Sequence, residues 1–183
     1  MSSILKVDTL QTAAGGVPTA ADLGLNVTGT VLQVKNLTYT DTFSQSITSG
    51  AVNNLQLSIT PTSSTSKILI QAHVFFEASV SDHDAIWYLQ RDSTSLSAPA
   101  AGSRKVGIAM AGIGYHGDDN ASTPSTVHID YYDEPATTSE VTYKVAVQAS
   151  SARTFYINRT VTDTDTNGYE RGISSITLME IAG

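Results

Sequence analysis

The feature of this sequence that most constrains its fold is the repeated alternation of apolar and polar residues. In NLQLSIT, Leu55, Leu57 and Ile59 alternate with polar residues, and EVTYKVAVQAS repeats the pattern over residues 140–150. A period of two sends successive side chains to opposite faces of a strand, so each segment should form a strand with one buried face. We find no amphipathic pattern of helical period longer than one turn. The sequence therefore predicts an all-β protein.

Nine segments carry strand patterns, and turn clusters such as TPTSSTS and DEPATTS separate them. The segment KILIQAHVFFEAS has one apolar face and a second, mixed face that includes Leu69, His73 and Phe75, as expected for a central strand. The turn spacing is typical of antiparallel sandwiches and not of alternating helices and strands. We predict an antiparallel β-sandwich or jelly roll of about nine strands, over residues 30–39, 54–60, 67–79, 85–92, 105–111, 126–132, 140–150, 154–161 and 173–181.

Composition narrows the class of protein further. Ser and Thr make up 46 of the 183 residues, whereas charged residues make up 15%, a balance that suits short strands and turns. The formal net charge of -7 disfavours nucleic-acid and anionic lipid surfaces, and no apolar run approaches the roughly 18 residues of a membrane span. The absence of Cys excludes disulfides and thiolate metal sites. We expect one packed core, no nucleic-acid partner and no membrane insertion.

Residues 1–28 follow neither pattern, and we interpret them as a docking arm that precedes a β-sandwich domain of residues 29–183. Lys6 and Asp8 interrupt the only stretch that resembles the apolar region of an export signal. The segment is too apolar for a solvated tail, yet Gly15, Gly16 and Pro18 break it into pieces too short for a core of their own. We expect it to lie in a groove of a partner or of a neighbouring copy. The predicted anchoring residues are Ile4, Leu5, Val7, Leu10, Val17, Leu23 and Leu25.

No set of catalytic residues stands out, and we expect neither enzymatic activity nor a cofactor. The segment GIGYHG, residues 112–117, has the form of a dinucleotide fingerprint, but no helix follows it to present backbone amides to a phosphate. The four histidines, His73, His83, His116 and His128, show no metal-ligand spacing along the chain. A Ser/His/Asp triad would become visible only in the tertiary structure.

The most specific local motif is DTDTNGYE, in which Asp163, Asp165 and Asn167 precede Gly168 as in the first half of a calcium-binding loop. However, Ser174 stands where such a loop needs a bidentate glutamate, and no helices are expected on either side. The alternative is a type I′ hairpin turn at Asn167 and Gly168. We favour the turn and leave the calcium site open.

Four aromatic residues are candidates for binding a surface sugar: Trp87, Tyr88, Tyr115 and Tyr169. Aromatic rings combine a wide contact area with a polar group, as sugar-binding sites require. Strand alternation places Trp87 and Tyr88 on opposite faces, so at least one of them should belong to the core or to a subunit interface. The sequence alone therefore does not identify a sugar site.

Segments distributed along nearly the whole chain resemble those of a known group of proteins. They are the arm SILKVDTLQTAAGG…DLGLNVTGTVLQV and the later segments LSITPTSSTSKILIQAHVFF, YLQRDSTSL, YYDEPATTSEVTYKV and YINRT…GISSITLMEIAG. Together these segments resemble virion proteins of marine bacteriophages, especially cyanophages. In such proteins an N-terminal segment attaches to a virion component and a β-rich C-terminal domain projects outward, commonly as a trimer, in short tail fibres or capsid decorations.

The resemblance implies a non-enzymatic structural protein of the virion, with other capsid or tail proteins as partners. No repeat occurs between residues 28 and 183, so a fibre shaft is not expected and the chain would be a short tail fibre or surface knob. A capsid decoration protein and a host-glycan receptor-binding module remain open as alternatives. Independently of the resemblance, Leu69, His73 and Phe75 suit a partly polar interface between copies, whereas the number of three copies comes from the resemblance alone.

Overall fold

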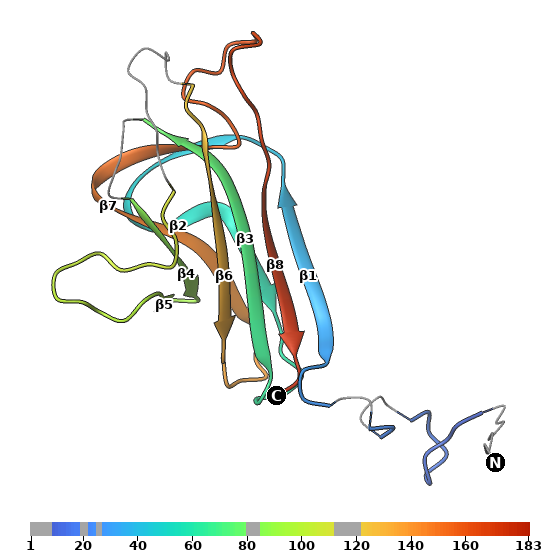
Figure 1. Ribbon diagram of the computed structural model, residues 1–183. Coiled ribbons are helices and arrows are strands. Elements are labelled where there is room, and N and C mark those ends of the chain that lie inside the picture. Colours follow the sequence, from blue (N-terminus) through green and yellow to red (C-terminus); the bar gives the residue numbers. More distant parts are fainter. Residues whose placement is uncertain (1–8, 19–21, 25–26, 80–84, 112–121) are drawn as a thin grey trace, which may run out of the picture.

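The computed structural model describes residues 9–18, 22–24, 27–79, 85–111 and 122–183, and within these ranges the protein is all-β with no helix (Figure 1). The predicted fold class is therefore confirmed. Eight strands are formed where alternation or high β-propensity allows one face to be buried. They are β1 (Val31–Tyr39), β2 (Phe43–Ile59), β3 (Lys67–Ala78), β4 (Ile86–Arg91), β5 (Thr94–Leu96), β6 (Ser125–Asp133), β7 (Val141–Ile157) and β8 (Ser174–Ile181).

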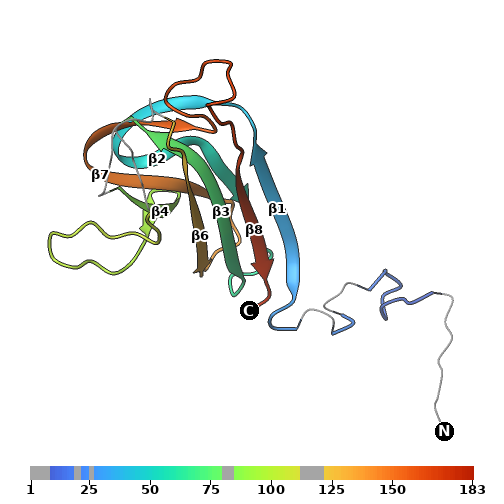
Figure 2. The same ribbon diagram turned by 45° about the horizontal axis from the view of Figure 1, so that its top comes forward.

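The strands form one antiparallel sheet that folds over into two layers (Figures 1 and 2). The first layer has the order β6-β3-β8-β1, and the second has the order β2-β7-β4-β5. The layers are joined where residues Phe76–Ala78 of β3 pair with the end of β7. The segment predicted to be a central strand is central, because β3 has partners on both sides.

The bend that allows β7 to reach both layers arises from irregular pairing with β2. The register shifts between Ile47 and Ser49 and again between Ala51 and Gln56. Extra residues at such bulges bend a strand and increase its twist. As a result, the first half of β7 pairs with β4 and its last residues pair with β3.

The core lies between the layers and is centred on three aromatic rings. Trp87 of β4 lies 4.7 Å from Phe76 of β3 and 5.6 Å from Phe155 of β7, measured between ring centroids. The apolar face of β3 also points inward, and Ile68, Ile70, Ala72 and Val74 are buried. One-sided burial of this kind is what the alternating sequence predicted, and burying each large side chain contributes about 1.5–3 kcal/mol to folding.

The strand prediction missed β5 and the first part of β2, and it was wrong in two further segments. The segments 140–150 and 154–161 are largely parts of the single long strand β7, because residues between them continue in extended conformation past the bulge. Residues 105–111 do not form a strand and make only one bridge, between Ala109 and Trp87. Gly107 passes so close to β4 that an added Cβ would lie 2.6 Å from the carbonyl oxygen of Trp87, so this segment crosses the strand end and does not extend the sheet.

A buried asparagine fastens the end of β7 to three other elements. Asn158 Nδ2 donates hydrogen bonds to the carbonyl oxygens of Tyr39 and Asp41, at 2.8 and 2.9 Å, and Oδ1 accepts one from Ser174 Oγ at 2.7 Å. Its backbone N–H donates to the carbonyl of Phe75 on β3. The backbone φ of 61° lies in the left-handed region, which Asn tolerates better than most residues.

Candidate assembly surfaces

The arm leaves the β-domain at the end where the C-terminus lies (Figure 1). Its root is held by a short exchange of backbone hydrogen bonds, from Gly29 N–H to the Ala182 carbonyl and from Ala182 N–H to the Thr30 carbonyl, each at 2.8 Å. Before this root, the described arm residues lie outside both sheet layers (Figures 1 and 2). The β-domain thus buries its core without help from the described part of the arm.

The apolar side chains of the arm that the structure describes are exposed. Val17 is 85% exposed and Val27 is 62% exposed, and Leu10 and Leu23 are also among the exposed large apolar residues. If a partner covered these side chains, each Å² of apolar surface removed from water would contribute about 25 cal/mol of hydrophobic free energy. Of the predicted anchoring residues, Ile4, Leu5, Val7 and Leu25 lie outside the described residues.

A tight turn reverses the chain within the arm at Gly15 and Gly16. Thr12 N–H donates to the Gly16 carbonyl and Gly15 N–H donates to the Thr12 carbonyl, both at 2.8 Å. Gly15 has a φ of 81°, which only glycine adopts without strain. Residues 9–10, which begin the described part of the arm, are not in a strand.

The outer face of the first layer carries an apolar row that crosses all four strands. Antiparallel register aligns Val34 of β1 with Met179 of β8, Met179 with Leu69 of β3, and Leu69 with Tyr132 of β6. Residues directly opposite one another share a face of the sheet, so these four side chains form one continuous band, which we call the apolar row. Val34 is 56% exposed and Tyr132 is 51% exposed. No part of the described chain covers this band completely.

The next row along the same face is polar, and its side chains form hydrogen bonds with one another. Asn36, Thr177, Gln71 and Asp130 align across the four strands. Asn36 Nδ2 donates to Thr177 Oγ1 and Gln71 Nε2 donates to Asp130 Oδ1, both at 2.8 Å. The outer face therefore combines an apolar band with satisfied polar groups, the composition of interfaces that are not permanently buried.

The third row contains two of the four histidines. His73 of β3 lies directly opposite His128 of β6, and their rings stack with centroids 4.8 Å apart and planes inclined by 28°. A shallow hollow of about 270 Å³ lies over these rings and over Asp130 and Ser175. Partial burial, and then repulsion by His128, lowers the pKa of His73, so its imidazole is neutral at neutral pH. Sequence analysis missed this pair because only strand register brings the two residues together.

The three residues predicted for an interface between copies do not occupy equivalent places. Leu69 lies in the apolar row and His73 lies two residues further along the same face, so both are accessible. Phe75 is half-buried like the other two, but Gly172 of its own chain packs against its ring, where an added Cβ would lie only 2.4 Å away. The structure instead places Val34, Met179 and Tyr132 beside Leu69, an arrangement that only the strand register reveals.

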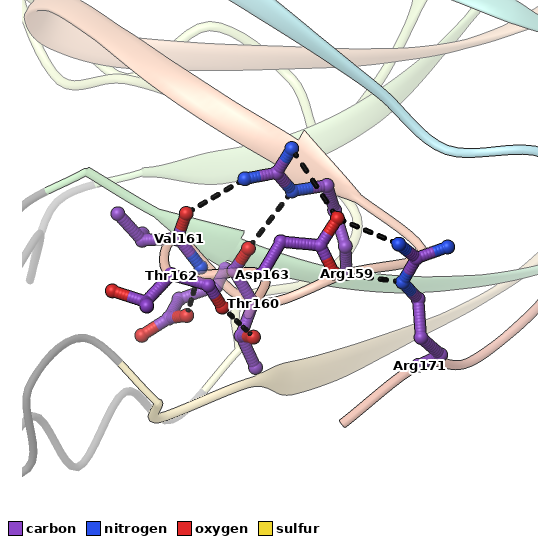
Figure 3. Close-up of polar contacts among 7 residues, drawn as sticks. Arg159, Thr160, Val161, Thr162, Asp163 and Arg171 are labelled. Carbon is purple, nitrogen blue, oxygen red and sulfur yellow. Dashed lines mark hydrogen bonds and ion pairs between the residues drawn. The ribbon is translucent and has the colours of Figure 1, made fainter. Parts of the chain in front are cut away.

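The acidic loop after β7 is organised by arginines (Figure 3). Both carboxylate oxygens of Asp163 accept hydrogen bonds from Arg171, at 2.8 and 2.7 Å, and Arg159 Nη1 lies 3.6 Å from Asp163 Oδ2. Arg159 also donates to the carbonyl oxygens of Thr160 and Val161. Asp163 is thus already neutralised by cations of its own chain.

This arrangement differs from the calcium loop that the sequence left open. Among the described residues, no group of three or more His, Asp or Glu side chains is placed to hold a metal ion. Asp163 is occupied by Arg171, whereas Asp165 and Asn167 are exposed. The type I′ alternative is also wrong, because neither Asn167 nor Gly168 has the positive φ that such a turn requires.

Two of the four candidate sugar platforms belong to the core. Trp87 is completely buried among Phe76 and Phe155, and Tyr88 is also buried, so neither ring can receive a ligand. Tyr169 is half-buried beside Asp163 and Arg171, and Tyr115 lies outside the described residues, as do His83, His116 and the segment 112–117.

The described arm and the apolar row both expose apolar side chains. No described helix has the length and apolar character needed to cross a membrane. No protein-family model matches the chain, and no curated protein matches it either.

Proposed function

We propose that this chain is a non-enzymatic structural protein of a bacteriophage virion, a short tail-fibre or surface-knob protein. In this proposal, the N-terminal arm anchors the protein to the particle, and the β-domain oligomerises and projects outward. The observation that carries the proposal is the division of the chain into a β-domain with its own core and an arm whose described apolar side chains are exposed. The assignment to a phage virion comes from the resemblance of the sequence to virion proteins of marine bacteriophages.

The arm supports the anchoring role because its apolar side chains have no cover in the single chain. Ordering a segment of this length opposes docking by about 1–2 kcal/mol per residue, so a partner must bury much of its apolar surface. Extended segments meet this requirement by lying along a groove or a sheet edge of another protein. Capsid and tail proteins are the proposed partners.

The apolar row supports the oligomer. Its four side chains lie on one flat face, and the adjoining polar row has already satisfied its hydrogen bonds. A copy that packs against this face would bury apolar side chains without leaving polar groups unpaired. The proposed oligomer is a trimer, a number taken from the resemblance.

Light scattering of the full chain tests the oligomer. We expect a mass near three chains, and we expect Met179→Glu and Leu69→Glu to reduce it to one chain, because each places an unpaired charge in the apolar row. Gln56→Glu is the matched control, since this exposed residue lies on β2 in the other layer. A monomeric full chain, or row variants that keep the mass of the full chain, would contradict this part of the proposal.

Electron microscopy of the particle tests the location. Density for the β-domain on the tail supports a tail-fibre or knob protein, and density spread over the capsid supports the decoration alternative. Absence of the chain from purified particles would refute the virion role. The host-glycan alternative gains no support from the described aromatic residues, because Trp87 and Tyr88 are buried.

A further inference from the structure

Two histidines form a pair on the outer face, and their side chains contribute no hydrogen bond to the described part of the fold. His73 and His128 occupy directly opposed positions on β3 and β6, and both side chains point away from the core. Within the described part of the chain, neither imidazole makes a hydrogen bond, so their ring nitrogens remain available as ligands.

The chemistry of the two rings matches that of a metal ligand. Imidazole nitrogen is the commonest protein ligand of transition-metal ions, and the register places two imidazoles directly opposite each other. The rings line an open hollow, so an ion can reach them from solvent. Asp130, the next outward residue of β6, lines the same hollow and adds negative charge beside it.

We propose that His73 and His128 together bind one Zn²⁺ ion, with water completing its coordination. Tetrahedral Zn²⁺ holds nitrogen ligands at about 2.0–2.1 Å, so the two donor nitrogens must converge to about 3.3 Å from each other. The rings are stacked in the structure, with centroids 4.8 Å apart, so the proposed site requires both imidazoles to rotate about their side-chain bonds. The protein supplies two ligands, because no third His, Asp or Glu among the described residues converges on the pair.

Imidazole ligands also define the class of ion. Zn²⁺ and the neighbouring late transition-metal ions accept imidazole nitrogen, whereas Mg²⁺ and Ca²⁺ prefer carboxylate, carbonyl and water oxygen. Bound Zn²⁺ would link β6, the edge strand of the first layer, to the central strand β3. This inference does not depend on the proposed virion role, since it concerns a site within one chain.

Calorimetric titration of the tag-free full chain with ZnCl₂ tests the site. We expect one ion per chain with a dissociation constant in the micromolar range, and no heat of binding with MgCl₂. Changes even to residues behind metal ligands weaken metal binding 10- to 100-fold, so His73→Gln and His128→Gln should each weaken it by at least about tenfold. The other two histidines provide matched controls, and His83→Gln and His116→Gln should bind Zn²⁺ as the unmodified chain does.

Thermal unfolding gives a second readout of the same site. Zn²⁺ should raise the Tm of the unmodified chain and of the two control variants but not that of His128→Gln, because an ion that binds only the folded state stabilises it. His128 lies on an edge strand and is exposed, so its replacement should leave the fold intact even if a change at His73 does not. Absence of zinc binding by the full chain, or zinc binding that survives both His73→Gln and His128→Gln, would overturn the proposal.

Discussion

Replacing Asn158 by aspartate should destabilise the β-domain strongly although it changes the shape of the side chain very little. The Asn158 amide donates to the Tyr39 and Asp41 carbonyls, and a carboxylate has no proton to donate to either. The bond from Ser174 Oγ would remain, because a carboxylate oxygen still accepts it. The Asn158→Asp variant therefore removes two hydrogen bonds and directs negative charge at two carbonyl oxygens.

The expected magnitude follows from the burial of this site. A buried polar group left without its partner costs about 1–3 kcal/mol, so two carbonyls cost roughly 2–6 kcal/mol in the free energy of unfolding. A typical domain has a total stability of about 5–15 kcal/mol, so this loss would be a large fraction of it. Urea unfolding monitored by the fluorescence of the single tryptophan, Trp87, measures the difference.

The loss should depend on pH in a defined direction. Burial beside two carbonyl oxygens disfavours ionisation of the introduced carboxyl, so its pKa in the folded state should exceed the unfolded value of about 3.9. When a carboxyl group has a higher pKa in the folded state than in the unfolded state, the free energy of unfolding falls as pH rises from the unfolded pKa to the folded pKa. The deficit should therefore be full at pH 7 and smaller near pH 4, where the protonated carboxyl can donate one of the two bonds.

Asn36→Asp provides the control, because Asn36 is exposed on the outer face and its replacement should change stability by no more than about 0.5 kcal/mol. An Asn158→Asp variant that loses less than about 1 kcal/mol at pH 7, or one whose deficit grows toward low pH, would refute this account of how β7 is fastened.

Two further predictions concern carboxylates. Burial raises the pKa of Glu180, but hydrogen bonds from Thr62 and Gln33 outweigh burial and lower it overall, so its contribution to stability is present at pH 7 and is lost as pH falls through the folded pKa. The Glu180→Gln variant should accordingly be less stable than the unmodified chain at pH 7, by an amount that shrinks toward pH 3 in urea unfolding. Millimolar Ca²⁺ should leave the Tm unchanged, because Arg171 already neutralises Asp163, whereas a clear rise would show that calcium displaces the arginine.

The strands that sequence analysis predicted best are those buried on one side only. Residues 67–79 and 173–181 match β3 and β8 to within one residue, because one-sided burial enforces a period of two. In β2, only residues 54–60 were predicted, since the earlier part is rich in Ser and has no regular apolar face. Local pattern does not reveal a polar strand that is held mainly by backbone pairing with β7.

Sequence analysis could predict a candidate surface only where its residues lie in a single segment of the chain. The mixed outer face of β3 was visible in its own sequence, so Leu69 and His73 were predicted there. The partners of these residues, Met179 and His128, come from distant strands, and only the register places them alongside. Asn158 is a similar case, because its role depends on a left-handed backbone and on carbonyls of another strand end.

Removal of the arm tests the central claim most directly. A chain that starts at Gly29 retains the hydrogen bond from Ala182 N–H to Thr30 and the whole core, and it loses only arm residues of which the described apolar members are exposed. Its free energy of unfolding should lie within about 0.5 kcal/mol of that of the full chain. When both chains are supplied during particle assembly and the purified particles are analysed, only the full chain should be incorporated. A truncated chain that unfolds, or one that is incorporated as well as the full chain, would contradict the assignment of residues 1–28 as the anchor.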